Sequence, residues 1–291
     1  MSVINVIRDF EYHVPETVQE AVEILSRYDD ICIIAGGTDV IPKLKSGILQ
    51  PAHLISLKGL KELKNVRYDE KEGLVFGAGC TLRELEAFEP VRKHYVALWE
   101  GMHSIANTQI RNAGTPVGNI VNALPSADTS APMLVLEAKL RAVSVQGERI
   151  IPVDELFTGV SRTCLQPDEL VTEVMIPPLK PGTGTMYFKY SVRKALDLAM
   201  VGTAAKITVE NGVCTDAKIG LGAVAITPKR ALHAEKILVG RKLTEEVIAE
   251  AALVASEQDC EPITDMRATK EYRREMVRVM TRDTIKQAII C

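Results

Sequence analysis

Two glycine-containing segments hold the residues best suited to bind a charged ligand. The first reads Ala35-Gly36-Gly37-Thr38-Asp39, and the second, residues 109–120, reads QIRNAGTPVGNI. Both combine glycine with Thr, Asn or Asp, so the backbone can leave regular structure and aim several peptide N–H groups into one concavity. Such a concavity can hold a diphosphate without a lysine. Either segment alone could equally be a tight turn, so the prediction depends on both acting together. At roughly 1.5–3 kcal/mol for each charge-assisted hydrogen bond, about four or five amides from these two segments would suffice for submicromolar binding of a dinucleotide.

Other nucleotide-binding patterns fit the sequence less well. Residues 220–225 match GxGxxA, but Pro228 follows where a phosphate-binding helix should run, and the preceding hairpin makes the strand antiparallel. We interpret these residues as a glycine-bearing strand. The sequence contains no GxxxxGK[ST], which excludes a P-loop nucleotide hydrolase.

The cysteines and histidines are widely spaced. The closest cysteines, Cys260 and Cys291, are 31 residues apart, so no pair has the short spacing that presents two thiolates to one metal. We therefore expect no cysteine-ligated iron–sulfur cluster and no disulfides, and interpret the cysteines as buried small hydrophobic residues. The five histidines form no HExxH or HxH pattern, so a metal site would have to be assembled from distant segments. We predict no metal site.

Composition indicates a globular protein of two domains. The 291 residues are 46% hydrophobic and 25% charged, close to the average for soluble proteins. The formal net charge of -3 leaves no excess positive field to hold nucleic acid or an anionic membrane. The first residues carry charges where a signal peptide needs an apolar core, and no run approaches about 18 apolar residues. The predicted location is the cytoplasm.

Capping and periodicity predict the elements that position the first glycine segment. Thr17 with Glu20 predicts a helix over 18–28. The apolar run 31–35 then predicts a buried parallel strand that ends at the first glycine segment. The remaining elements predicted in this half are strands 54–57 and 73–78, a helix capped by Thr81 and Glu84, a longer helix through Val91, Tyr95, Leu98, Met102 and Ile105, and a hairpin of strands 138–145 and 149–153.

The second glycine segment lies within residues 107–128, which have almost no periodicity. We expect a long ordered loop there, and such loops are usually functional. The Pro/Gly cluster 177–184 is the expected domain boundary. Beyond it the sequence predicts three antiparallel strands, a turn at Asn211-Gly212, and two helices: strands 185–192, 199–209 and 213–223, then helices 245–258 and 270–290, the last with Tyr272, Met276, Val279 and Met280 on one face.

These segments together resemble a known family, the flavin-binding medium subunits of molybdenum hydroxylases. The first glycine segment resembles the family's first flavin loop, and SIANTQIRNAGTPVGNI resembles the second, IRNxGTxGGN. Three further stretches follow in the family's order: SADTSAPMLVLEAKL, LFTGVSRTCLQPDELVTEVMIP and YFKYSVRKALDLAMVG. The resemblance spans the whole chain. It implies an α+β fold, with a PCMH-type (vanillyl-alcohol oxidase-like) FAD-binding domain over 1–178, in subdomains of about 1–57 and 58–178, and a small C-terminal domain over 184–291.

The resemblance also implies the site residues. FAD would contact Cys32, Ile33, Ile34, Ala35, Gly36, Gly37, Thr38, Asp39, Ile105, Gly114, Thr115, Gly118, Asn119, Asp128, Leu170 and Lys189. Lys189 would act as the catalytic residue, because a cation beside the flavin ring favours the negative charge that reduction builds. From the residues alone, Lys189 could be a solvated strand residue and Asp128 a helix cap.

The second loop departs from the family pattern. Pro116 and Val117 stand before Gly118, where the family usually has a glycine at the position of Val117. Pro116 has no N–H and restrains Thr115 to an extended conformation, while Val117 resists positive φ. We expect the loop to bind through the amides of Thr115, Gly118 and Asn119, along a path shifted at residue 117.

The resemblance implies an electron-transfer subunit in a heterotrimer that is itself doubled. A molybdopterin-binding large subunit would oxidise the substrate, a 2Fe-2S small subunit would relay electrons, and FAD in this chain would pass a hydride to NAD. Arg193 and Asp197, within 189–197, are the candidate NAD contacts. The alternatives are a stand-alone flavin oxidoreductase of the same fold and a scaffold subunit that has lost flavin through Pro116-Val117. The substrate, whether a purine, nicotinate, an aldehyde or carbon monoxide, is left open.

Overall fold

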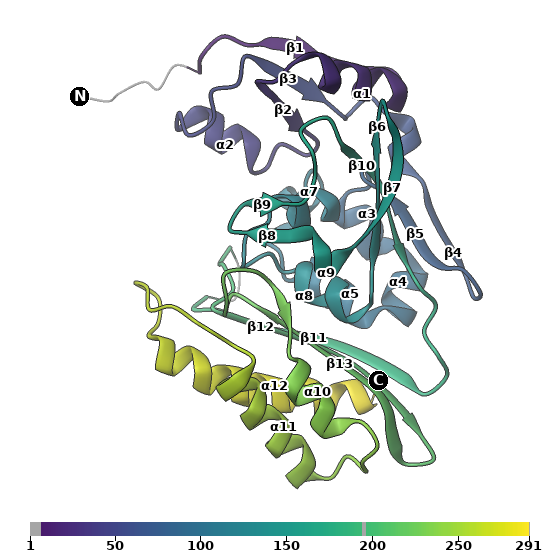
Figure 1. The fold of residues 1–291 in the computed structure, drawn as a ribbon, viewed down its shortest axis with the longest axis vertical. Helices are drawn as coiled ribbons and strands as arrows, with labels where there is room; N and C mark the ends of the chain where they lie inside the picture. The colour runs from purple at the N-terminus through teal and green to yellow at the C-terminus, as the bar shows by residue number, and fades with distance from the viewer. Residues whose placement is uncertain (1–6, 194–195, 291) are drawn as a thin grey trace.

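The computed structural model describes residues 7–193 and 196–290 and consists of three parts stacked along the long axis (Figure 1). The N-terminal part contains a parallel sheet, the middle part an antiparallel sheet with many short helices, and the C-terminal part a second antiparallel sheet with three helices on its outer face. The chain therefore has the α+β architecture that the sequence predicts.

The N-terminal part is a three-stranded sheet in the order β1-β3-β2. Its strands are β1 (Glu11–His13), β2 (Ile31–Ile34) and β3 (His53–Ser56), and its helices are α1 (Val18–Arg27) and α2 (Val40–Lys45). Thr17 caps α1 by accepting a hydrogen bond from the Glu20 amide at 3.1 Å. The Glu20 carboxylate accepts from the amide of Glu16 rather than from that of Thr17, so only half of the predicted capping box forms. A buried cluster that includes Val22, Leu25 and Ile55 joins α1 to the sheet.

The middle part is built on a five-stranded antiparallel sheet in the order β4-β5-β10-β6-β7. Its strands are β4 (Val66–Asp69), β5 (Gly73–Gly77), β6 (Lys139–Ser144), β7 (Gly147–Pro152) and β10 (Leu170–Ile176), with the 3-10 helix η1 (Lys61–Lys64) before them and the short hairpin β8 (Phe157–Gly159) and β9 (Arg162–Thr163) beside them. The helices are α3 (Leu82–Ala87), α4 (Glu89–His94), α5 (Val96–His103), α6 (Thr108–Arg111), α7 (Pro116–Val121), α8 (Ser130–Val135) and α9 (Val153–Leu156). The predicted β6–β7 hairpin and the reciprocal Thr81–Glu84 capping box of α3 both form.

Two predictions for this part are wrong. The single long helix expected through Val91 and Ile105 is broken at Tyr95, which separates α4 from α5 and has φ of -121°. The 107–128 segment is not one long loop, because α6 and α7 lie within it. Periodicity misses these helices because each is too short to repeat an apolar face. Their start signals, the side chains of Asn107 and Thr115 at the two N-caps, are local instead.

The C-terminal part is a four-stranded antiparallel sheet in the order β11-β12-β13-β14. The strands are β11 (Thr183–Tyr190), β12 (Val201–Glu210), β13 (Val213–Gly222) and β14 (Lys229–Arg230), so a short fourth strand joins the three predicted. Asn211 and Gly212 both have positive φ, 51° and 78°, as the predicted two-residue turn requires. The helices are α10 (Leu232–Leu238), α11 (Glu245–Gln258) and α12 (Lys270–Ile290).

The buried face of α12 differs from the predicted face by one residue. Arg273, Val277 and Ile285 are buried, whereas Tyr272 is exposed and Met276 only half-buried. The Arg273 guanidinium donates hydrogen bonds to the carbonyls of Met200 and Ala223. Arg273 is therefore buried with carbonyl acceptors at a position that an apolar periodicity does not assign to the buried face.

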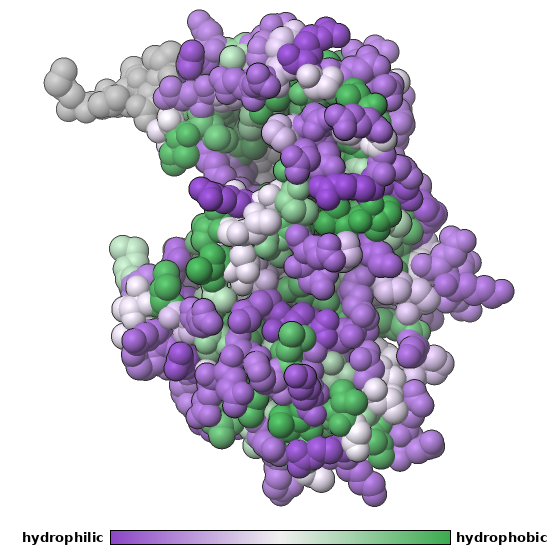
Figure 2. All heavy atoms as spheres, in the orientation of Figure 1, coloured by the Kyte–Doolittle hydropathy of each residue, from purple (hydrophilic) through white to green (hydrophobic). Residues whose placement is uncertain are grey.

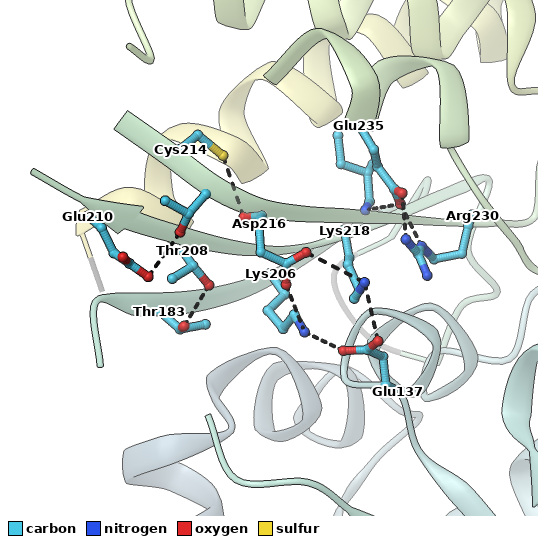
Figure 3. A network of polar contacts seen from close by, with 12 residues as sticks. Glu137, Thr183, Lys206, Thr208, Glu210, Cys214, Asp216, Lys218, Arg230 and Glu235 are labelled. Carbon is cyan, nitrogen blue, oxygen red and sulfur yellow. Dashed lines mark hydrogen bonds and ion pairs between the residues drawn. The ribbon is translucent and has the colours of Figure 1, made fainter. Parts of the chain in front are cut away.

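The opposite face of the C-terminal sheet packs on α5 and α8 of the middle part, and Tyr187 and Ala204 belong to the core of that part. At the margin of this contact, Glu137 forms ion pairs with Lys206 at 2.5 Å and Lys218 at 3.2 Å, and Asp216 completes the network (Figure 3). Burial favours protonated Glu137, but the hydrogen bonds and charges of the two lysines outweigh it and hold the pKa of Glu137 below its ordinary value. The network therefore connects the middle and C-terminal parts through charged groups.

Among the cysteines, Cys80, Cys214 and Cys260 are buried as predicted, while Cys32 and Cys164 are half-buried. Burial raises the pKa of the Cys80 and Cys214 thiols to about 11. Cys291 lies outside the described residues. No helix within residues 7–193 and 196–290 combines the length and the apolar character needed to cross a bilayer.

Candidate functional site

The first glycine segment connects the end of β2 to the start of α2. Residues 35–39 leave the parallel sheet at its carboxyl edge, and Gly37 has φ of 74°, which a residue with a side chain adopts at a cost. Within the part of the chain that the structure describes, no group accepts a hydrogen bond from the backbone amides of 36–39. These amides precede and begin a helix, so their unpaired N–H groups favour an anion.

The second segment is organised by two helix caps. The Asn107 side chain accepts a hydrogen bond from the Ile110 amide at 2.9 Å and starts α6. Thr115 is extended, with φ of -114° and ψ of 147°, as expected of a residue before proline. Pro116 then occupies the first turn of α7, where its missing N–H leaves no bond unmade. Val117 follows within the helix, so it needs no positive φ.

This geometry changes which amides of the second segment are available. The Gly118 amide donates to Thr115 Oγ1 at 2.9 Å, and the Asn119 amide donates to the Thr115 carbonyl at 3.0 Å. Two of the three amides expected to bind are thus already bonded within α7. Among the described residues, the amides of Thr115 and Val117 have no acceptor. The expected donors therefore become Thr115 and Val117.

The two glycine segments meet at backbone contact. A Cβ atom added to Gly36 would lie 2.0 Å from the carbonyl oxygen of Ala113 and 2.8 Å from Gly114 Cα. Only glycine fits at position 36, because any side chain would displace the neighbouring backbone. Gly114 is in turn held by its amide, which donates to the Ile110 carbonyl at 2.7 Å. The contact that the sequence argument requires is present in the fold.

The segments border a cavity of about 510 Å3, and the surface is visibly indented between the N-terminal part and the part below it (Figure 2). All but two of the predicted site residues line it: Ile33, Ala35, Gly36, Gly37, Thr38, Asp39, Ile105, Gly114, Thr115, Gly118, Asn119, Asp128, Leu170 and Lys189. Cys32 and Ile34 do not line it. Side chains alternate along a strand, so when Ile33 and Ala35 face the cavity their neighbours in β2 face away.

A buried ion pair, formed by Lys189 and Asp128, lies in another part of the cavity wall. Lys189, from β11, donates to Asp128 Oδ2 at 2.8 Å and to the Ser104 carbonyl at 3.1 Å. The Tyr187 hydroxyl donates to the other oxygen of Asp128 at 2.8 Å. Asp128 is therefore not a helix cap, and Lys189 is not a solvated strand residue, since 9% of its side chain is exposed.

Burial raises the pKa of Asp128, although the charge and hydrogen bond of Lys189 and the hydrogen bond from Tyr187 act in the opposite direction. Burial first and the Asp128 charge second raise the pKa of Tyr187. Tyr187 therefore stays a neutral hydrogen-bond donor to the carboxylate.

Several functional features were not predicted from the sequence. Most are apolar residues that complete the cavity wall: Val40, Leu57, Ala78, Leu82, Ala106, Ile110, Val117, Val121, Leu124, Leu165 and Val171. Tyr187 was missed as well, although its two-residue spacing from Lys189 on a predicted strand places both side chains on one face.

Arg111 was missed although it lies in the second glycine segment. It is buried, donates to Glu86 Oε2 at 3.2 Å and to the Ile105 carbonyl at 3.0 Å, and so fixes the backbone beside the cavity. Burial opposes ionisation of Glu86, but His103, Arg111 and Arg83 hold its pKa below the ordinary value. The presence of an arginine in a glycine-rich segment was the available signal for a structural role. Its partner, Glu86, lies 25 residues away, so the sequence does not identify the pair.

The segment near the mouth of the cavity contains both candidate NAD contacts. The Arg193 amide donates to Asp197 Oδ2 at 2.9 Å, and its guanidinium donates to the Leu196 carbonyl at 3.2 Å. Asp197 lines the cavity, together with the exposed Leu196 and Leu198. Residues 194 and 195 of the predicted 189–197 segment lie outside the described residues.

The cavity lining fits a dinucleotide. Unpaired backbone amides at converging loops suit a diphosphate, and the mainly apolar wall suits a flat aromatic ring. Lys189 lies in the same wall. Fold and site define a class, the dinucleotide-binding proteins. Residues 8–179 match the family described as FAD binding domain in molybdopterin dehydrogenase, and residues 186–288 match the CO dehydrogenase flavoprotein C-terminal domain.

Individual relatives are similar over nearly their whole length. The chain is 33% identical to the xanthine dehydrogenase FAD-binding subunit of Escherichia coli O157:H7, over 96% of this chain and 95% of that protein. It is 34% identical to the carbon monoxide dehydrogenase medium chain of Afipia carboxidovorans, over 96% of each. A carbon monoxide dehydrogenase structure from Hydrogenophaga pseudoflava superposes with a TM-score of 0.93 at 32% identity, over 97% of this chain and 98% of that one.

This chain belongs to the FAD-binding subunits of the molybdenum hydroxylase family, and its cofactor is FAD. The resemblance noted from the glycine segments and the predicted fold class are both confirmed. The chain is thus an FAD-dependent dehydrogenase subunit.

Proposed function

We propose that this subunit takes electrons from a 2Fe-2S subunit and passes them to NAD as hydride, within a complex whose molybdopterin-binding subunit oxidises the substrate. The observation that carries the proposal is the single cavity that joins two converging glycine segments to the Asp128–Lys189 pair. FAD supplies the exchange between one-electron and two-electron chemistry. The chain's own residues bind, orient and charge-balance it.

The proposed contacts divide along the cavity. The amides of 36–39, with those of Thr115 and Val117, would hold the diphosphate. Lys189 would stand beside the ring, where its ammonium favours negative charge on reduction. Because Asp128 compensates much of that charge, the pair would act as an oriented dipole whose positive end is the lysine. The other predicted residues that line the cavity would shape the pocket and exclude water: Ile33, Ala35, Ile105, Gly114, Gly118, Asn119 and Leu170.

The partners are inferred from chemistry that this chain lacks and from its relatives. Its widely spaced cysteines provide no cluster-binding motif, so a one-electron relay requires another polypeptide. Relatives named for xanthine and for carbon monoxide are 33% and 34% identical to it. The sequence identity of this chain therefore does not favour one of these two substrates over the other. This agrees with selection of the substrate by a different subunit. We propose a heterotrimer, doubled in the complete complex.

Two variants test the flavin site. Gly36→Ala should release FAD, because its Cβ would displace the Ala113 carbonyl. Gly59→Ala is the matched control, since a Cβ there has its nearest neighbour at 3.7 Å. The measurement is flavin absorbance retained after gel filtration, with circular dichroism to verify the fold. Equal FAD retention by both variants would show that the loop contact does not shape the site.

The electron path is tested in the complex and in the isolated chain. Coexpression with the neighbouring reading frames should yield a complex containing molybdenum and iron, and the isolated FAD-loaded chain should oxidise NADH with an artificial dye. Arg193→Ala should raise the NADH concentration for half-maximal rate about tenfold, the effect of one charge-assisted hydrogen bond. Arg241→Ala removes a comparable surface arginine paired with Glu250 and should change nothing. Substrate turnover by the chain alone would instead indicate a stand-alone oxidoreductase, and absence of NADH oxidation would reject NAD as acceptor.

A further inference from the structure

A second group of ligand-type side chains lies on the N-terminal sheet, apart from the flavin cavity. Strand β1 pairs in parallel with β3, and the register places Glu11 opposite His53. His13 is two residues beyond Glu11, so both side chains project from the same face of β1. None of the three residues lines the cavity. Strand pairing thus assembles two histidines and a carboxylate whose sequence separation gives no metal-binding pattern.

Two of the three distances in this group match those around a tetrahedral metal ion. His13 Nε2 lies 3.1 Å from His53 Nδ1, and Glu11 Oε2 lies 3.5 Å from the same nitrogen. All three ligand atoms lie within 4.8 Å of one another. Ligands about 2.0–2.1 Å from a tetrahedral zinc ion are about 3.3–3.4 Å apart, so two of the separations already agree within a few tenths of an ångström. The Glu11 side chain is 63% exposed and can rotate to correct the third.

The backbone and one aromatic ring hold the ligands in place. The Glu11 amide donates to the Ala52 carbonyl at 2.9 Å, and the His53 amide donates to the Asp30 carbonyl at 3.0 Å. The Tyr28 ring stacks on His53 with centroids 3.8 Å apart, and its centroid lies 5.2 Å from that of His13. Both imidazoles are therefore oriented before any ion binds, which reduces the entropy lost on binding.

We propose that Glu11, His13 and His53 bind one divalent transition-metal ion of the zinc type. Two imidazoles favour such an ion over Ca2+ or Mg2+, which prefer oxygen ligands. Three protein ligands leave a fourth tetrahedral position for water or another ligand. The bound ion links β1 to β3, in the sheet whose third strand, β2, leads into the first flavin loop. The bound ion stabilises that sheet. The proposed metal site does not depend on which electron acceptor the flavin uses.

The test uses the full-length, FAD-loaded protein, dialysed against chelator and then titrated with ZnCl2 in a calorimeter. We expect one Zn2+ per chain and a higher melting temperature at saturation. His53→Ala removes the nitrogen that both other ligands approach and should weaken binding by about a hundredfold or more. Glu11→Gln alters an exposed side chain that the fold does not need and should weaken binding about tenfold.

A histidine outside the group provides the control. His94 stacks on Tyr68 with centroids 5.0 Å apart, so His94→Ala removes a similar side chain and a similar aromatic contact. We expect His94→Ala to bind Zn2+ as the unmodified chain does. Binding well below one ion per chain in the unmodified protein would overturn the proposal. Equal loss of binding in His94→Ala and His53→Ala, or unchanged binding in Glu11→Gln, would also overturn it.

Discussion

Replacing Lys189 with methionine should destabilise the chain in a way that depends on pH. Methionine fills nearly the same volume, so the main change is that the buried Asp128 loses the ammonium 2.8 Å from its Oδ2. Among the described residues it then retains only the Tyr187 hydroxyl as a side-chain donor. Removing one partner of a buried ion pair typically costs about 3–5 kcal/mol, because the remaining charge is uncompensated. We expect a loss of that size in the free energy of unfolding at about pH 8.

The sign of the pH dependence follows from the pKa of Asp128. Burial already raises this pKa, and the substitution removes both influences of Lys189 that lower it, so the pKa in the folded variant rises further. A carboxyl group whose folded-state pKa is raised loses its stabilising effect as the pH climbs through that value. The deficit of Lys189→Met should therefore shrink toward about pH 5. It changes by about 1.4 kcal/mol for each unit of pH over which Asp128 holds the proton in the folded variant but not in the folded unmodified chain.

The assay is urea unfolding of the FAD-free chain, monitored by the fluorescence of its single tryptophan, Trp99, at several pH values. Removing FAD ensures that altered flavin affinity does not enter the comparison. The matched control is Lys189→Met with Asp128→Asn, which leaves a neutral amide beside Tyr187 and should recover most of the lost stability. A deficit that is equal at both ends of the pH range, or a double variant no more stable than Lys189→Met, would refute the argument.

Two further substitutions test packing and the charged network. Gly202→Ala would place a Cβ 2.7 Å from the Tyr187 hydroxyl and should cost about 1–3 kcal/mol of unfolding free energy; the same change in a Tyr187→Phe background should cost less, and an equal cost would count against the predicted clash. Glu137→Gln removes the ion pairs to Lys206 and Lys218, and because nearly half of the Glu137 side chain is exposed, screening limits the loss to about 1 kcal/mol or less. The pKa of Glu137 is lowered, so its contribution is present above the unfolded-state pKa and disappears as the pH falls through the folded-state value. Urea curves for Glu137→Gln and the unmodified chain should therefore converge in acid and in high salt, and a constant difference would disprove the network's role.

Local signals predicted the regular elements well wherever the pattern was long or strongly punctuated. Helix α11 begins and ends where the sequence predicts, and the Asn211-Gly212 turn has the expected positive φ at both residues. The short helix α7 was missed because six residues cannot establish a period. The face of α12 was misplaced because a buried arginine, Arg273, donates to the carbonyls of Met200 and Ala223, which lie 73 and 50 residues away in the sequence.

The sequence by itself determined where the backbone could turn and which segments carry glycine, because φ preferences and capping depend on neighbouring residues. It also determined the family, through the order of motifs along the whole chain. Only the tertiary structure decided which amides remain unpaired, that Lys189 faces a carboxylate, and that His13 meets His53. The last two depend on contacts between residues 40 or more positions apart, which no local pattern encodes. The unpaired amides follow from the caps of short helices that periodicity does not reveal.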